Sequence, residues 1–143
     1  MTMLRCAFLL AVFVTLASAE EVSGSWKAWF VGEKRVKTPG EMTFELKADG
    51  SKVTGMAHMP NWPGDAEITG AKLAGNRLSF TVTGNSPWWS SGPGGEKSSG
   101  YPKIEFEWQL KGSEADIKLV WGNVMIYGTA PEPMKMEMKA KKQ

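Results

Sequence analysis

Residues 41–83 show a regular alternation of apolar and polar side chains that turn dipeptides interrupt at short intervals. Such alternation gives a β-strand one buried side and one solvent-facing side, as in antiparallel sheets. The segments between successive turns are too short to hold the crossover helices that parallel strands require. The pattern therefore predicts an antiparallel meander of consecutive hairpins.

The clearest turn signal is Asp49-Gly50, because this dipeptide favours two-residue hairpin loops. If Ala48 and Ser51 flank the turn, one face of the hairpin is apolar throughout. The predicted pairs are Leu46 with Val53, Phe44 with Gly55, and Met42 with Ala57. The opposite, solvent-facing side receives Lys47, Lys52, Thr43, Met56, Glu41 and His58.

A second hairpin is predicted at Gly75-Asn76, with Leu73 facing Leu78. Ile68 falls out of phase with this apolar face. A β-bulge at Gly70 would restore the phase, because a bulge inserts one extra residue into a strand.

The rest of the chain repeats the strand pattern, apart from a predicted irregular loop over 84–100 and a predicted turn at Gly122-Asn123. With the strand that follows Asp49-Gly50, the count is about eight or nine strands and no helix. A sheet of this size usually closes on itself or splits into two sheets, and consecutive hairpins favour closure. We therefore expect an all-β fold, a single antiparallel up-and-down barrel of about eight strands. Besides the strand that follows Asp49-Gly50, the predicted strands cover 24–31, 42–48, 66–73, 78–82, 103–110, 117–121, 124–127 and 134–140.

Residues 1–19 have the features of a cleaved signal peptide. Arg5 precedes an apolar run over 7–16, and Ala17-Ser18-Ala19 matches the small-x-small pattern of a cleavage site before Glu20. The run is shorter than the ~20 residues that span a bilayer, so we expect export and no membrane span. The mature domain would comprise residues 20–143 and be periplasmic or extracellular, without the chain's single cysteine.

The net charge of the predicted mature chain argues against polyanionic partners such as nucleic acid or anionic lipid. Removal of Arg5 takes Lys and Arg from 17 to 16 against 15 Asp and Glu, which leaves a net charge near +1. Such a chain lacks the positive field that attracts nucleic acid or anionic lipid. We therefore expect no nucleic-acid partner, and we expect a monomer.

The first predicted strand carries Gly24-Ser25-Trp26, and the last strand ends near two cations, Lys139 and Lys141. This combination resembles the calycin arrangement of lipocalin-like barrels, in which a basic side chain packs over the tryptophan. Residues 49–55 and 68–80 are similar to small exported bacterial barrel domains of uncharacterised function. The resemblance implies that Trp26 and one of these lysines close one end of the barrel.

The sequence holds no constellation that is typical of an enzyme. It has no Gly-x-Ser-x-Gly and no Ser-x-x-Lys motif, and its single histidine cannot serve several tasks. Glu105 and Glu107 lie on one strand face, but Lys103 and Gln109 mark that face as solvated. We therefore expect a non-enzymatic protein without a cofactor.

A copper(I) site is an alternative that the methionines leave open, because thioether and imidazole ligands suit Cu(I). Met134, Met136 and Met138 share one strand face, and Met56 and His58 share another. The predicted facing places the first three inside the barrel and His58 outside, and methionine is also a common filler of apolar interiors.

The best functional candidates are Trp88 and Trp89, adjacent aromatic residues in the predicted glycine-rich loop, with Trp62 in a second loop. At a barrel rim they could stack on a sugar ring or cover a small apolar ligand. The function predicted is an exported binding module for such a ligand. The alternative is that one of these rings fills the interior, in a structural or envelope-associated barrel without a ligand.

Overall fold

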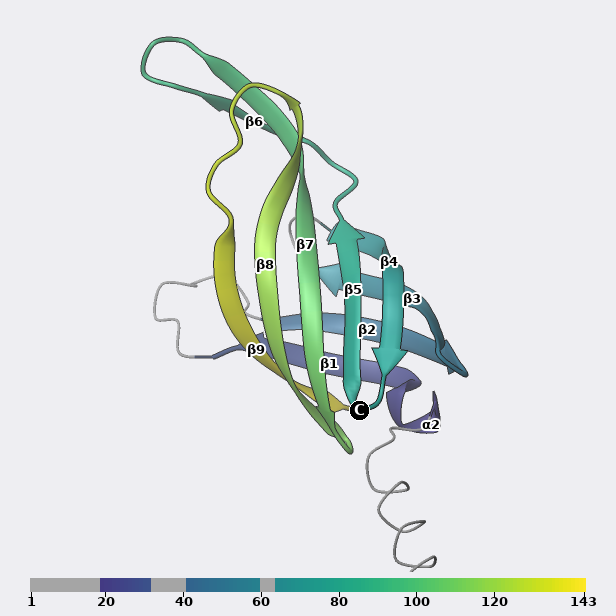
Figure 1. Ribbon diagram of the computed structural model, residues 1–143. Helices are drawn as coiled ribbons and strands as arrows, with labels where there is room; N and C mark the ends of the chain where they lie inside the picture. The colour runs from purple at the N-terminus through teal and green to yellow at the C-terminus, as the bar shows by residue number, and fades with distance from the viewer. Residues whose placement is uncertain (1–18, 32–40, 60–63) are drawn as a thin grey trace, which may run out of the picture.

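The computed structural model describes residues 19–31, 41–59 and 64–143 (Figure 1). The predicted signal peptide lies outside these ranges except for Ala19. One short helix precedes nine strands in the described part of the chain. The elements are α2 (Ala19–Val22), β1 (Gly24–Phe30), β2 (Glu41–Asp49), β3 (Lys52–Met59), β4 (Gly64–Ala74), β5 (Arg77–Thr83), β6 (Trp88–Ser91), β7 (Lys97–Lys111), β8 (Glu114–Tyr127) and β9 (Met134–Lys142).

Eight of the strands form a closed antiparallel barrel with up-and-down order, which confirms the predicted fold class. The sheet order is β5-β4-β3-β2-β1-β9-β8-β7-β6, and a further pairing between β5 and β7 closes the ring. The remaining strand, β6, pairs with β7 beyond the end of the ring. It therefore belongs to an extension of the barrel.

The first hairpin has the predicted faces but not the predicted register. Asp49 pairs with Lys52, so Gly50 and Ser51 form the two-residue turn. Gly50 has φ +64°, a conformation that glycine adopts without steric cost. The observed partners are Ala48 with Val53, Leu46 with Gly55 and Phe44 with Ala57. The inward set is unchanged, because each residue's partner differs from the predicted one by two positions, which is one full side-chain period.

The second hairpin confirms both the turn and the bulge. Ala74 pairs with Arg77 across Gly75-Asn76, and Leu73 faces Leu78. The register shifts between Thr69 and Lys72. Gly70 has φ +62°, which is the left-handed conformation that a bulge residue often requires.

Two predictions about the second half of the chain are wrong. Residues 84–100 are not an irregular loop, because they include β6 and the first residues of β7, which form a hairpin. Gly122-Asn123 is not a turn, because β8 continues through it while paired with Lys103 and Pro102. In both places the residues have a low propensity for strands, but hydrogen bonds to a long neighbouring strand hold them in an extended conformation.

The barrel end that holds the short turns is covered by α2 (Figure 1). Val22 and Trp26 are fully buried, and the Trp26 indole nitrogen donates a hydrogen bond of 2.8 Å to the Val22 carbonyl. Lys142 Nζ donates to the Glu21 carbonyl at 3.2 Å. The helix therefore seals this end through contacts with both β1 and β9.

The cations that the resemblance assigned to this closure, Lys139 and Lys141, lie elsewhere. Both are exposed on β9, opposite Trp29 and Lys27 of β1. The prediction was wrong because strand alternation turns Met138 and Ala140, not the lysines between and beside them, toward the core. The lysine that reaches the closed end is Lys142.

Candidate functional site

Aromatic side chains fill the interior of the barrel near its closed end. Trp26 and Trp108 meet edge to face with their ring centroids 5.4 Å apart, and Phe44 lies 5.2 Å from Trp108. Phe80 and Phe106 stack at 5.2 Å. These five side chains are all buried. Their rings fill this part of the interior, so a ligand site is expected on the surface.

The extension beyond the barrel is a three-stranded sheet made of β6, the start of β7 and the end of β8 (Figure 1). Two neighbouring rows of facing residues cross it. The row nearer the barrel is Trp88, Gly100 and Met125, and the outer row is Trp89, Ser99 and Tyr127. Consecutive residues of a strand point to opposite faces, so the two tryptophans are on different sides of this sheet.

Trp88 is half-buried and its polar atom is occupied. Its indole nitrogen donates a hydrogen bond of 2.7 Å to Asn123 Oδ1. Its carbonyl accepts a hydrogen bond of 2.9 Å from the hydroxyl of Ser99. These contacts tie β6 to β8 and β7, so Trp88 holds the extension together.

Trp89 is the exposed member of the pair, with 66% of its surface accessible. Its ring centroid lies 5.8 Å from that of Tyr127, which is 41% exposed, at an interplanar angle of 62°. Ser99 sits between them in the row and is completely buried. A small residue at this position allows the two rings to meet across the middle strand.

A surface cavity of about 300 Å³ adjoins these rings. Besides Trp89 and Tyr127 it is lined by Ser90, Ser91 and Lys97. The lining therefore includes two aromatic residues, two serines and one lysine. Such a mixture can hold a ring-shaped ligand that has both C–H and O–H groups.

The sequence analysis identified Trp89 but missed Tyr127 and Lys97. Tyr127 was assigned to a separate strand after a turn at Gly122-Asn123, and Lys97 to an irregular loop. Their positions depend on the continuous β7–β8 ladder, in which Ser99 pairs with Tyr127. The third tryptophan candidate, Trp62, lies outside the described residues.

The structure does not bring the methionine and histidine candidates together. Met138 of β9 is 1% exposed and points into the core of the barrel, whereas His58 of β3 lies on the outer face of the barrel. Met134 was expected inside but is 57% exposed, because β9 begins there, at the rim opposite Trp121. A single copper site that uses all five candidates is therefore excluded by the barrel wall between them.

His58 forms a small ionic cluster that links three strands. Its Nδ1 lies 3.0 Å from Asp65 Oδ1 on β4, and its Nε2 lies 3.5 Å from Glu45 Oε2 on β2. The hydrogen bond with Asp65, assisted by Glu45, raises the pKa of His58 above its ordinary value despite partial burial. Across the described ranges, no group of three or more His, Cys, Asp or Glu side chains is arranged to hold a metal ion.

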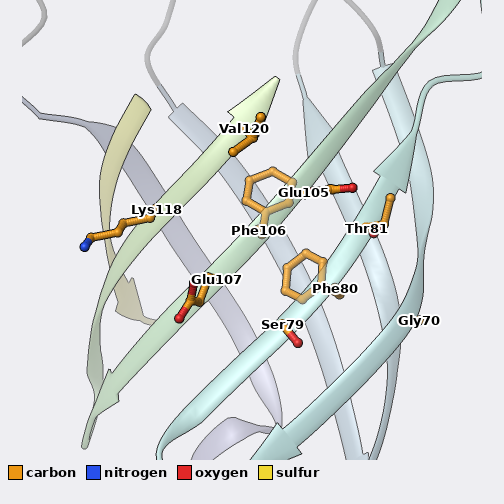
Figure 2. Close-up of a pocket in the computed structure, with 9 residues that line it drawn as sticks. All are labelled: Gly70, Ser79, Phe80, Thr81, Glu105, Phe106, Glu107, Lys118 and Val120. Carbon is orange, nitrogen blue, oxygen red and sulfur yellow. The ribbon is translucent and has the colours of Figure 1, made fainter. Parts of the chain in front are cut away.

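A second cavity, of about 320 Å³, lies on the outer face of β5, β7 and β8, and Figure 2 shows its lining. Glu105 and Glu107 both border it, but they are more than half exposed and each has a cation nearby. Lys103 Nζ is 3.9 Å from Glu105, and Arg77 is 3.8 Å from Glu107. Such solvated ion pairs are typical of an outer strand face and give neither carboxylate a special chemical role.

No protein-family model, curated protein or solved structure matches the chain. In the part of the chain that the structure describes, no helix is long and apolar enough to cross a membrane.

Proposed function

We propose that this protein is an exported, non-enzymatic module that binds carbohydrate at the exposed Trp89–Tyr127 pair. The observation that carries the proposal is this ring pair at 5.8 Å beside a cavity lined by Ser90, Ser91 and Lys97. The C–H groups of a sugar ring can pack on the aromatic surfaces while its hydroxyls bond to the polar lining. The signal-peptide pattern of residues 1–19 supports export.

Carbohydrate is favoured over an apolar ligand inside the barrel for two reasons. The interior near the closed end is occupied by buried rings, including Phe44, Phe106 and Trp108. The cavity at Trp89 is open to solvent and has several polar groups, which would be left unpaired by a purely apolar ligand.

Binding should be tested on a glycan array, followed by calorimetric titration of the best oligosaccharide. The variant Trp89→Ala removes the larger ring and should weaken binding at least tenfold. Trp29→Ala is the matched control, because Trp29 is also a partly exposed tryptophan but lies on β1 of the barrel wall. It should bind like the unmodified protein.

Two results would contradict the proposal. If no oligosaccharide binds, the alternative of a filled structural barrel is favoured. If binding survives in Trp89→Ala but is lost in Trp29→Ala, the ligand occupies a different face of the barrel.

A further inference from the structure

We infer that the Trp89–Tyr127 site selects acidic sugars, with Lys97 as the residue that binds the sugar carboxylate. This inference rests on the proposed carbohydrate-binding function and names the class of carbohydrate. It is based on the position of Lys97, on the lack of an ionic partner for it among the described residues, and on the direction of the neighbouring acidic residue.

Lys97 lies on the same face of the extension as the aromatic pair. It is the first residue of β7 and pairs with Ser91 of β6, two positions before Ser99. Residues two apart on a strand share a face and lie about 6.6–7 Å apart along it. A hexose ring that rests on Trp89 can therefore carry a substituent within reach of the lysine.

The ammonium group of Lys97 is available for an anion. Among the described residues, no ion pair includes Lys97, and its side chain is exposed. The adjacent acid, Glu96, faces the tight turn of the β6–β7 hairpin. Its carboxylate oxygens lie 2.5 and 2.7 Å from the places that a β-carbon would take on Gly92 and Gly94.

The absence of β-carbons on Gly92 and Gly94 therefore leaves room for the Glu96 carboxylate beside the turn, and Glu96 does not line the cavity. If Gly92 or Gly94 carried a side chain, Glu96 would have to move. Within the described residues, the cavity lining thus contains one cationic side chain and no carboxylate. A ligand carboxylate would form an ion pair with the Lys97 ammonium group, whereas a neutral sugar would leave that group solvated.

The inference can be tested with an array that pairs each neutral oligosaccharide with its uronic acid counterpart. The unmodified protein should bind the acidic member about two- to fivefold more tightly, which is the scale of one ion pair in a solvated site. Lys97→Met should remove this preference, so that the acidic and neutral members of each pair bind with equal affinity. Lys72→Met, which removes an exposed lysine on β4 away from the site, should keep the preference.

The possible failures are distinguishable. Equal binding of the neutral and acidic members, or a preference that survives in Lys97→Met, would overturn the selection of acidic sugars and leave the proposed function intact. The lack of any Trp89-dependent binding on the whole array would overturn both. A preference for acidic sugars that Lys72→Met also abolishes would show a general charge effect and would overturn the role of Lys97.

Discussion

Trp26 donates its indole N–H to the Val22 carbonyl at 2.8 Å, and both residues are fully buried at the closed end of the barrel. Trp26→Phe keeps an aromatic ring but leaves that carbonyl without its donor. We expect a loss of about 1–3 kcal/mol in the free energy of unfolding, measured by denaturant titration. Trp29→Phe on the outer face should change it by less than about 0.5 kcal/mol. Equal losses in the two variants would show that the cap does not depend on this bond.

The buried indole of Trp108 carries an unpaired polar group in the core. Its nitrogen has no hydrogen-bond partner among the described residues, and its ring contacts Trp26 and Phe44. Trp108→Ala should cost about 3–5 kcal/mol, because it opens a large cavity. Trp108→Phe should cost at least about 1 kcal/mol less than Trp108→Ala, because it keeps most of the packing and removes the unpaired donor. Equal thermal stabilities of the two variants would contradict this account.

Trp88 and Trp89 should have separable effects. Trp88→Phe removes the donor to Asn123, and a double-mutant cycle with Asn123→Ala should give a coupling of about 0.5–1.5 kcal/mol in the free energy of unfolding. Trp89→Ala should change stability by less than about 0.5 kcal/mol while it weakens ligand binding. A large stability loss in Trp89→Ala would instead make this exposed ring part of the folded core.

Gly55 should be intolerant of any side chain. A β-carbon there would lie 3.0 Å from the carbonyl carbon of Glu45 and 3.1 Å from Leu46 Cα, both backbone atoms of β2. Gly55→Ala should therefore cost about 1–3 kcal/mol or more, measured by thermal or denaturant unfolding. Gly122→Ala is the control, because its nearest contacts are 3.7 and 3.9 Å and it should be nearly neutral. Similar stabilities of the two variants would show that β2 can move away from β3.

His58 should make stability depend weakly on pH. Its pKa is raised in the folded protein by the hydrogen bond with Asp65, assisted by Glu45. The stabilisation is therefore full below the unfolded-state pKa and is lost as the pH rises through the higher folded-state pKa. Because the cluster is largely solvated, its effect should not exceed about 1 kcal/mol.

The measurement for His58 is the melting temperature as a function of pH. The difference between the unmodified protein and His58→Asn should shrink as the pH rises above neutrality. Asp65→Asn should reduce the pH dependence more than Glu45→Gln does, because Asp65 is the closer partner. A difference that grows with pH would contradict a raised pKa.

The fold class and the inward faces follow from the sequence, because side-chain burial in a strand has a period of two, and an error of two positions in the pairing leaves every side chain on the same face. The hairpin at Gly50 shows this: its turn lies one residue from the predicted place, yet Phe44 and Leu46 still point inward. The bulge at Gly70 was also predictable, because it corrects a phase change between Ile68 and Leu73 that is visible in the sequence.

The candidate site and the closed end of the barrel depend on long-range strand pairing, which short sequence patterns do not reveal. Trp89 and Tyr127 are 38 positions apart, and they meet because β7 continues beyond the ring and pairs with both β6 and β8. Local propensity predicted a loop and a turn in these segments, since long-range ladder hydrogen bonds are not encoded in any short window. For the same reason the lysine that reaches the cap, Lys142, follows from the pairing of β9 with β1 and not from its position near Lys139 and Lys141.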